Sequence, residues 1–147
     1  MPLFETLQSD LKTAMLEKQE QKRDTLRMII ASLKNQRIQL SRELTDADVI
    51  KTLVSEKKTR QESIEQYTVG GREDLVAKEK AEIEIIDLYL PKQMNENEIL
   101  ETIEETIDAV GATEMRDMGK VMGILQAKLT GKADMKEVSA LVKSKLS

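Results

Sequence analysis

Residues 117–147 read DMGKVMGILQAKLTGKADMKEVSALVKSKLS. Apolar residues return every three or four positions on both sides of Gly131, a period typical of amphipathic helices. The buried arc of the first predicted helix comprises Met118, Val121, Met122, Leu125 and Leu129. The buried face of the second comprises Val138, Leu141, Val142 and Leu146. Asp117 and Asp134 precede these helices and are expected to cap them, so the stretch predicts a helix pair joined by a turn.

A strip of small residues interrupts the first of these helices. Gly119, Gly123 and Ala127 are spaced by four, so they lie on one helix face. A glycine inside a helix costs about 1 kcal/mol relative to alanine, so two at this spacing need a reason. The strip either lets another helix of the same domain pack closely or offers a flat face to an external partner. The sequence leaves both explanations open.

Lysines surround this strip. Residues 118–147 contain six lysines and two acidic residues, a local charge of +4, whereas the whole chain carries −4. The candidate nucleic-acid-binding residues are Gly119, Lys120, Gly123, Lys128, Lys132, Lys136 and Lys143. The surface indicates either an anionic partner or a solvated lysine face. If nucleic acid binds, lysines would read phosphates and shape, because one Phe, two Tyr and no Trp leave little for base stacking.

The rest of the chain continues the helical pattern. The first 69 residues contain no glycine, and apolar stripes predict helices through residues 4–15, 26–40, 45–67 and 75–90. Gly70-Gly71 separates the last two, and Pro91 ends the fourth. Thr45 can cap the third of these helices. Asn95 and Glu98 give a capping-box-like start to a further helix, which Gly111 ends. We therefore predict an all-α protein, with an N-terminal four-helix part at residues 1–92 and a small three-helix C-terminal domain at residues 95–147.

Composition excludes several kinds of chemistry. The chain has no histidine and no cysteine, which removes imidazole bases, thiol nucleophiles and most zinc sites. Glycine-rich phosphate-binding motifs and the GxSxG motif are also absent. Glu98, Glu101 and Glu105 share a helix face, which is interpreted as a solvated face. We expect no catalytic residue, no metal and no cofactor.

The sequence also supports expectations about localisation, oligomeric state and the burial of single residues. No apolar run approaches 18 residues and the start MPLFETLQSD is unlike a signal peptide, so a cytoplasmic protein without a membrane span is expected. A monomer is also expected. Exposed helix positions are predicted for Arg27, Lys34 and Arg60. Gaps in a small core are expected to be filled by Met115, Met118, Met122 and Met135.

Several motifs resemble those of the YqeY family. The central one is Tyr67-x-x-x-Gly71-Arg72-x-Asp74-Leu75, followed by Glu79, Glu82 and Tyr89-Leu90-Pro91. Upstream are Leu26-Arg27 and Lys34, and downstream are Asp117-Met118-Gly119-Lys120-Val121-Met122-Gly123 and Gly131-Lys132-Ala133-Asp134. The motifs keep their order over essentially the whole chain, and the length matches a stand-alone member.

This family is similar to the C-terminal tail of GatB, the B subunit of the tRNA-dependent amidotransferase, which amidates misacylated Glu-tRNA or Asp-tRNA with glutamine as nitrogen donor. The resemblance implies a helical N-terminal part and a three-helix tail that recognises tRNA by shape. The shared tail pattern matches Gly123, Lys128, Gly131-Lys132-Ala133, Val138, Leu141 and Leu146. Asp134 stands where the GatB tail commonly has Asn, which weakens the expected anion contact. The catalytic cradle of GatB has no counterpart in this chain.

The leading hypothesis is a non-catalytic tRNA-binding or adaptor module associated with tRNA-dependent amidation. The alternative is a protein–protein accessory of an amidotransferase or aminoacyl-tRNA synthetase complex, docking through the N-terminal helices. A family-level label of carbon–nitrogen ligase activity with glutamine as amido-N-donor would describe the assembly, because a ligase needs a nucleophile that this sequence does not supply.

Overall fold

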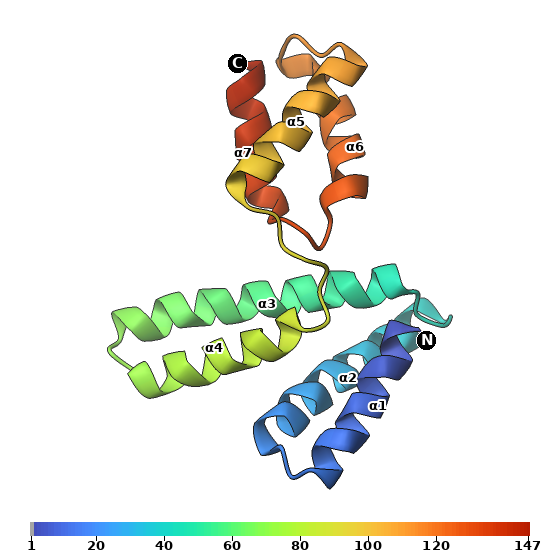
Figure 1. Ribbon diagram of the computed structural model, residues 1–147, viewed down its shortest axis with the longest axis vertical. Coiled ribbons are helices and arrows are strands. Elements are labelled where there is room, and N and C mark those ends of the chain that lie inside the picture. The colour runs from blue at the N-terminus through green and yellow to red at the C-terminus, as the bar shows by residue number, and fades with distance from the viewer. Residues whose placement is uncertain (1) are drawn as a thin grey trace. The chain divides into compact units, whose positions relative to one another are not determined.

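The computed structural model describes residues 2–147. Over this range the chain is all-α, as predicted, with seven α-helices, one short 3₁₀ helix and no strand (Figure 1). The chain divides into two compact units, Met1–Leu90 and Pro91–Ser147, called here unit 1 and unit 2. Helices α1 to α4 belong to unit 1, and helices α5 to α7 belong to unit 2.

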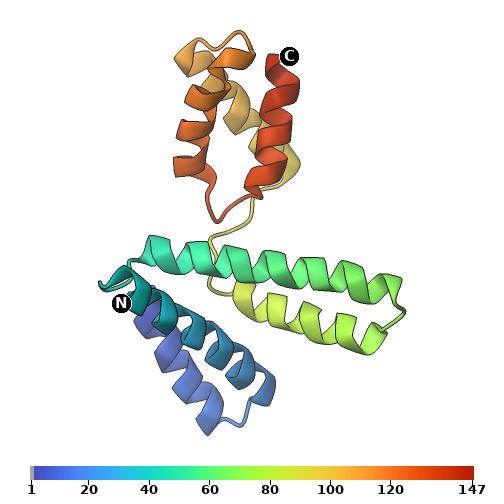
Figure 2. The same ribbon diagram turned by 180° about the vertical axis from the view of Figure 1, so that it is seen from behind.

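Unit 1 consists of two antiparallel helix pairs that are splayed apart at their far ends (Figures 1 and 2). Helix α1 (Leu3–Leu16) packs beside α2 (Glu20–Leu40), and α3 (Asp46–Val69) packs beside α4 (Glu73–Asp87). Their junction is filled by Phe4, Leu7, Leu26, Ile29, Ile30, Leu33, Val49, Leu53 and Ile86, all buried. Met15 and Leu40, the last residues of the predicted apolar stripes at 4–15 and 26–40, are exposed, and each lies in the last turn of its helix.

The start of α3 has the predicted cap. The amide of Asp48 donates to Thr45 Oγ1 over 3.2 Å, and the Thr45 amide donates to Asp48 Oδ2 over 2.9 Å. The Arg42 guanidinium donates to the same carboxylate from 2.6 Å. These bonds, that of Arg42 first, hold the pKa of Asp48 well below its usual value. The capping box therefore fixes both the first turn of α3 and the end of the loop before it.

A buried ion cluster links α3 to α4 and corrects one prediction. Arg60, expected to be exposed, is only 7% exposed, and its Nε lies 2.8 Å from Oε2 of Glu82, which is 6% exposed. Its Nη1 lies 2.7 Å from Oε2 of Glu56. Although burial opposes the charge, the hydrogen bonds to the two carboxylates raise the pKa of Arg60 above its ordinary value. The cluster occupies the place that aliphatic residues fill elsewhere in the unit.

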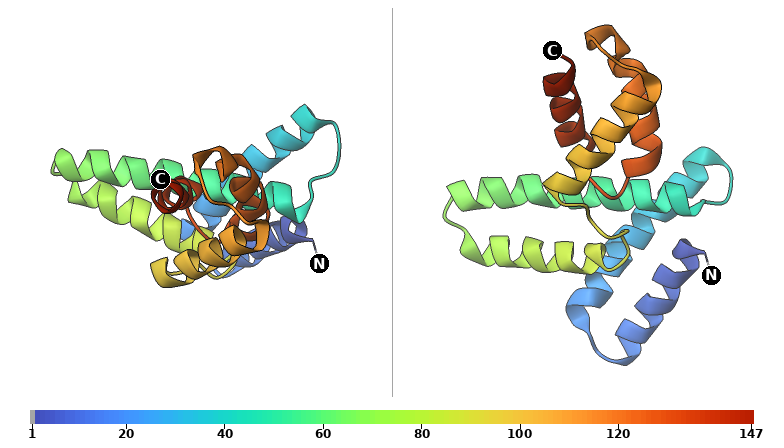
Figure 3. Two further views of the ribbon diagram at one scale, coloured as in Figure 1. Left: turned by 90° about the horizontal axis from the view of Figure 1, so that it is seen from above. Right: turned by 45° about the horizontal axis from the view of Figure 1, so that its top comes forward.

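Unit 2 consists of α5 (Glu96–Val110), the 3₁₀ helix η1 (Met115–Asp117), α6 (Met118–Leu129) and α7 (Met135–Leu146), as Figure 3 shows. The capping box of Asn95 and Glu98 is confirmed, and Gly111 ends α5 in the left-handed region at φ 67°. The core comprises Ile99, Ile103, Val121, Leu125, Leu129, Ala133, Val138, Val142 and Leu146. Met118, Met122 and Met135 pack against it as predicted, whereas Met115 is exposed because it lies in η1, outside the helix faces that form the core.

The two predicted aspartate caps of unit 2 differ in outcome. Asp134 caps α7 as expected, accepting a hydrogen bond from the Lys136 amide over 2.9 Å. Asp117 makes no side-chain bond to α6. Its Oδ2 instead accepts from the amides of Thr113 and Glu114, and these bonds lower the pKa of Asp117. Because η1 runs directly into α6, the carboxylate faces back to the loop that precedes both.

Candidate nucleic-acid interface

The glycine strip of α6 lies open. Gly119, Gly123 and Ala127 are all exposed. A Cβ atom added at Gly119 or Gly123 would meet nothing within 4 Å. Close packing of another helix against the strip is therefore wrong for the described chain. Of the two explanations left open by the sequence, a face available to an external partner remains.

The candidate lysines are unpaired in the part of the chain that the structure describes. Lys120, Lys128, Lys132, Lys136 and Lys143 are exposed, and no carboxylate of residues 2–147 lies within 4.0 Å of their ammonium groups. The sixth lysine, Lys145, differs because its Nζ lies 2.7 Å from Oε1 of Glu104. Five charges are thus free to meet an anion.

These five lysines form two groups. Lys128, Lys132 and Lys136 surround the turn that joins α6 to α7. Lys120 is in the first turn of α6 and Lys143 in the last turn of α7. Figure 1 shows that α6 runs into the turn and α7 runs back antiparallel to it. Lys120 and Lys143 therefore lie at the end of the helix pair that is away from the turn. A helix of 12 residues is about 18 Å long, which separates the groups.

The turn that carries Lys132 is held by the segment before α5. The Met94 amide donates to the Lys132 carbonyl over 2.9 Å, and Gln93 Nε2 donates to the Gly131 carbonyl over 2.6 Å. Gly131 is buried at φ 83°, a left-handed conformation that favours glycine. The Lys132 side chain therefore projects from a fixed backbone.

The start of α7 is a poor anion site by itself. Free amides at a helix start attract anions, but the Asp134 carboxylate already accepts the Lys136 amide. At the other end of the pair, the charge of Lys120 helps to lower the pKa of Asp117, after the two backbone hydrogen bonds. Binding of an anion would depend on the lysine side chains, which can neutralise phosphates but supply no nucleophile in this arrangement.

Comparison with known proteins identifies the family. A sequence model of the Yqey-like protein family matches residues 4–146. The chain belongs to the YqeY family. The sequence motifs therefore indicated the right family, and the match covers both units.

Fungal relatives carry the name "Altered inheritance of mitochondria protein 41, mitochondrial". That of Saccharomyces cerevisiae (strain YJM789) is 33% identical over 110 residues, 71% of this chain and 58% of the relative. That of Eremothecium gossypii is 38% identical over 88 residues, 57% of this chain and 46% of the relative. That of Pyrenophora tritici-repentis is 30% identical over 129 residues, 86% of this chain and 71% of the relative. The chain thus spans about half the length of the first two curated relatives.

The YqeY-family motif around Gly71 forms the turn between α3 and α4. Gly71 adopts φ 72°, and the amide of Arg72 donates to the Tyr67 carbonyl over 2.9 Å. Arg72 pairs with Asp74 through two hydrogen bonds of 3.2 and 3.1 Å, with both side chains exposed. Farther along, the Tyr89 hydroxyl donates to Asp10 Oδ2 over 2.6 Å. In this YqeY-family chain the Arg72–Tyr67 and Tyr89–Asp10 bonds connect helices, whereas Arg72 and Asp74 pair locally at the start of α4.

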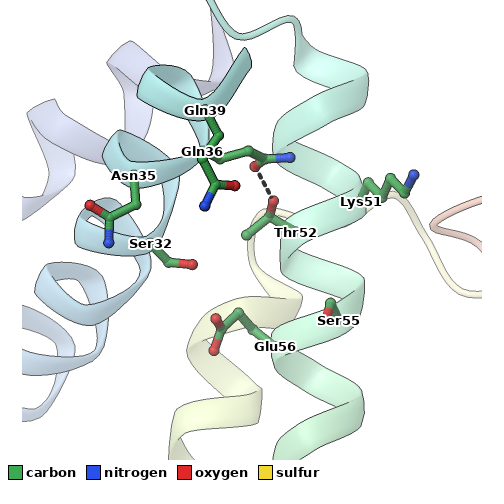
Figure 4. A pocket seen from close by; sticks show the side chains of 8 residues that line it. All are labelled: Ser32, Asn35, Gln36, Gln39, Lys51, Thr52, Ser55 and Glu56. Atoms are coloured by element: carbon green, nitrogen blue, oxygen red, sulfur yellow. Dashed lines mark hydrogen bonds between the residues drawn. The ribbon is translucent and has the colours of Figure 1, made fainter. Parts of the chain in front are cut away.

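A polar groove between α2 and α3 was missed by the sequence interpretation. It has a volume of about 410 Å³ and is lined by Ser32, Asn35, Gln36, Gln39, Lys51, Thr52, Ser55 and Glu56 (Figure 4). The Thr52 hydroxyl donates to Gln36 Oε1 over 2.6 Å. The four α2 residues have the spacing of one helix face, which could have revealed a polar stripe. The groove itself depends on the position of α3, which the spacing does not give.

Among the described residues, no group of three or more acidic side chains is placed to hold a metal ion. Glu98, Glu101 and Glu105 are exposed, in agreement with a solvated face. None of the helices in residues 2–147 is both long and apolar enough to cross a membrane.

Proposed function

We propose that this YqeY-family chain is a non-catalytic tRNA-binding or adaptor module associated with tRNA-dependent amidation. The observation that supports it is the set of five exposed, unpaired lysines on the α6/α7 pair, beside the open strip of Gly119 and Gly123. Lysine is suited to phosphate contact, and the strip lets a sugar–phosphate backbone approach α6 closely. Such a surface would read the shape of folded RNA and not its sequence.

The proposal predicts binding that weakens steeply with salt. Each phosphate neutralised by a lysine releases counterions, and contributes about −0.7 to −0.9 to the slope of log K against log salt. Lys128, Lys132 and Lys136 lie around one turn, so changing all three to Glu should remove most of the affinity. Fluorescence anisotropy with labelled tRNA between low and physiological salt measures both quantities.

A matched variant controls for net charge. Lys18, Lys58 and Lys80 are exposed residues of unit 1, and the same triple change to Glu alters the chain charge equally. This control variant should keep most of the tRNA affinity. Absence of tRNA binding at low salt by folded wild-type protein would reject the proposal, as would equal losses in both variants.

A protein–protein accessory of an amidotransferase or aminoacyl-tRNA synthetase is the second candidate. It is favoured by large apolar side chains left exposed on the N-terminal helices, among them Leu16 at 82% and Ile38 at 73%. Such residues are common contacts in protein interfaces. Affinity purification after nuclease treatment tests it, since a retained protein partner supports docking and its loss supports RNA bridging. Glutamine-dependent amidation by the purified chain alone would show that it is an enzyme and overturn both candidates.

The proposal also covers localisation, oligomeric state and domain boundaries. We propose a cytoplasmic monomer with domains at residues 1–92 and 95–147; the fungal relatives, by contrast, carry the word mitochondrial in their names. Light scattering after size-exclusion chromatography measures the oligomeric state. Limited proteolysis tests the domain boundary, because an exposed linker near Pro91 and Lys92 should be cleaved before either domain.

A further inference from the structure

The longest acid-free segment of unit 1 covers most of α2 and the two residues after it. Residues 25–42 include no acidic side chain, although 27 of the 147 residues of the chain are Asp or Glu. The segment carries Arg27, Lys34, Arg37 and Arg42. Of these, Arg42 is paired with Asp48, whereas the other three have no carboxylate of the described chain within 4.0 Å. The segment is therefore positive, and of these three Arg27 has a nearby acid, Asp24, whose pKa is lowered first by its hydrogen bond from Arg23 and also by the charge of Arg27.

Arg27 and Arg37 are oriented by contacts with uncharged groups. Arg27 Nη2 lies 3.9 Å from the Met15 sulfur, and the Arg37 guanidinium lies 5.7 Å from the centroid of the Phe4 ring. Lys34 follows Arg27 by seven residues and lies about 20° from it around the helix, and Arg37 lies about 60° farther round. They span about 15 Å, enough to contact several consecutive phosphates.

The polar groove lies farther round the exposed side of α2, with Asn35 and Gln39 about 80° and 120° from Arg27 and on the side away from Arg37. Asn35 and Gln39 are exposed there, each with an amide that can both donate and accept hydrogen bonds, and Figure 4 shows them beside Gln36 on α2. Gln36 is already bonded to Thr52. The acidic residue lining this groove, Glu56, is paired with Arg60 and is thereby compensated. The α2 surface thus carries both unpaired cations and exposed amides.

We propose that α2 is a second RNA-contact surface, in which Arg27, Lys34 and Arg37 hold phosphates while Asn35 and Gln39 hydrogen-bond to ribose 2′-hydroxyls or base edges. This inference rests on the proposed RNA-binding function and assigns to unit 1 the discrimination that lysines alone cannot provide. Phosphate contacts carry no sequence information, whereas amides distinguish base edges, and the 2′-hydroxyl distinguishes RNA from DNA. In this arrangement α2 adds phosphate contacts to those of the unit 2 lysines, and its amides add contacts that can distinguish RNA from DNA.

The amide half of the proposal is tested by the double variant Asn35→Ala/Gln39→Ala in the full chain. Its affinity for tRNA is compared with that for single-stranded DNA of the same length, by competition at fixed salt. The RNA-to-DNA affinity ratio should fall at least about fivefold, the loss of one good hydrogen-bonded pair, with the salt slope unchanged. The control Gln61→Ala/Gln66→Ala removes two exposed amides from α3 and should leave the ratio unchanged.

The cationic half is tested by Arg27→Gln/Lys34→Gln/Arg37→Gln. The salt slope for tRNA should become about 2 to 3 less steep, whereas Lys18→Gln/Lys58→Gln/Lys80→Gln should change it little. Because Arg37 packs over Phe4, the milder Arg27→Gln/Lys34→Gln keeps the test valid if the triple variant unfolds. Its slope should become less steep by about 1.5.

The outcomes separate this inference from the proposed function. If wild type and the unit 2 variants behave as expected but the α2 variants match wild type, the second surface is wrong and the RNA-binding function stands. If the folded wild type binds no RNA, both fail. If the α2 variants keep RNA binding and selectivity but lose a nuclease-resistant acidic protein, α2 is a protein-docking face and the inference is overturned.

Discussion

Unit 1 and unit 2 reach stability by different means. Each core cluster contains nine buried hydrophobic residues, yet these serve 90 residues in unit 1 and 57 in unit 2. In α3 the buried residue beyond Leu53 is Arg60, so the far part of the α3/α4 pair has the buried Arg60–Glu82 ion pair beside half-buried apolar residues such as Ile64 and Val76. Unit 2 therefore depends on one dense apolar core, whereas the far part of the α3/α4 pair combines half-buried apolar contacts with ionic ones.

The largest expected effect is a cavity in the compact core. Leu125 of α6 is fully buried, so Leu125→Ala should lower the free energy of unfolding of unit 2 by about 3–4 kcal/mol. Leu33→Ala makes the same change in unit 1, where Leu33 is equally buried. Calorimetry or urea unfolding should show the effect of Leu125→Ala in the transition of unit 2 and the effect of Leu33→Ala in the transition of unit 1. A single transition shifted equally by both would mean that the units unfold together.

Removing Arg60 from the ion cluster should lower the free energy of unfolding almost as much. Arg60→Met leaves Glu82 buried without its partner, and we expect a loss of about 2–4 kcal/mol in unit 1. The double variant Arg60→Met/Glu82→Leu removes both charges and should regain most of that loss, since an apolar pair of similar volume tolerates burial. Equilibrium unfolding of the three proteins measures the coupling. A double variant as unstable as Arg60→Met would show that the cluster contributes by a specific geometry.

Removal of the Tyr89 hydroxyl should lower stability by a smaller amount, and this amount should depend on pH. Burial and the hydrogen bond to Asp10 raise the pKa of Tyr89 well above its ordinary value. Because the neutral phenol is favoured in the folded state, its contribution is complete below the unfolded pKa of about 10 and is lost as the pH rises above it. Tyr89→Phe should therefore cost about 1 kcal/mol at neutral pH.

The stability gap between wild type and Tyr89→Phe should narrow above pH 10, as measured by urea unfolding across the pH range. Tyr67→Phe is the matched control, since no hydrogen bond of the Tyr67 hydroxyl occurs within residues 2–147. A gap that stays constant up to pH 12 would contradict the role given to the phenol proton.

The smallest effect is a gain in stability. Gly119→Ala and Gly123→Ala place a methyl group in open space inside a helix, so each should stabilise unit 2 by about 0.5–1 kcal/mol. Gly111→Ala is the opposite case, because φ 67° strains alanine and should lower stability by about 1 kcal/mol. Thermal unfolding measures all three. If the strip is a docking face, the two stabilised variants should also bind tRNA more weakly.

Local sequence patterns predicted the features of this chain that depend on local contacts. The capping boxes at Thr45 and Asn95 and the end of α5 at Gly111 follow from residue types within one turn. The exposure of the candidate lysines follows from their helix faces. The buried role of Arg60 did not follow, although Val49, Leu53 and Arg60 share a stripe, because its partner Glu82 lies 22 residues away on another helix.

The candidate sites also combine features set by the local sequence with features set by the packing of helices. The set of lysines was predictable, but their separation into two groups depends on the direction of α7 relative to α6. The polar stripe of Ser32, Asn35 and Gln39 was visible in the spacing, but a groove forms there because α3 diverges from α2. Sequence periodicity gives the face of a helix, and the angle between helices decides what that face borders.

The ionic connection of α3 to α4 also bears on the order in which unit 1 opens. A segment with few buried apolar contacts exposes its backbone amides through partial unfolding well before the global transition. Amides between residues 60 and 80 should therefore exchange with deuterium faster than those around Leu26 and Leu53, through an opening in which Arg60 and Glu82 separate into water. High salt would screen these charges once they are solvated and so favour the opened form. The tip that carries Gly71 and Arg72 would then behave as a semi-independent folding element whose protection varies with ionic strength.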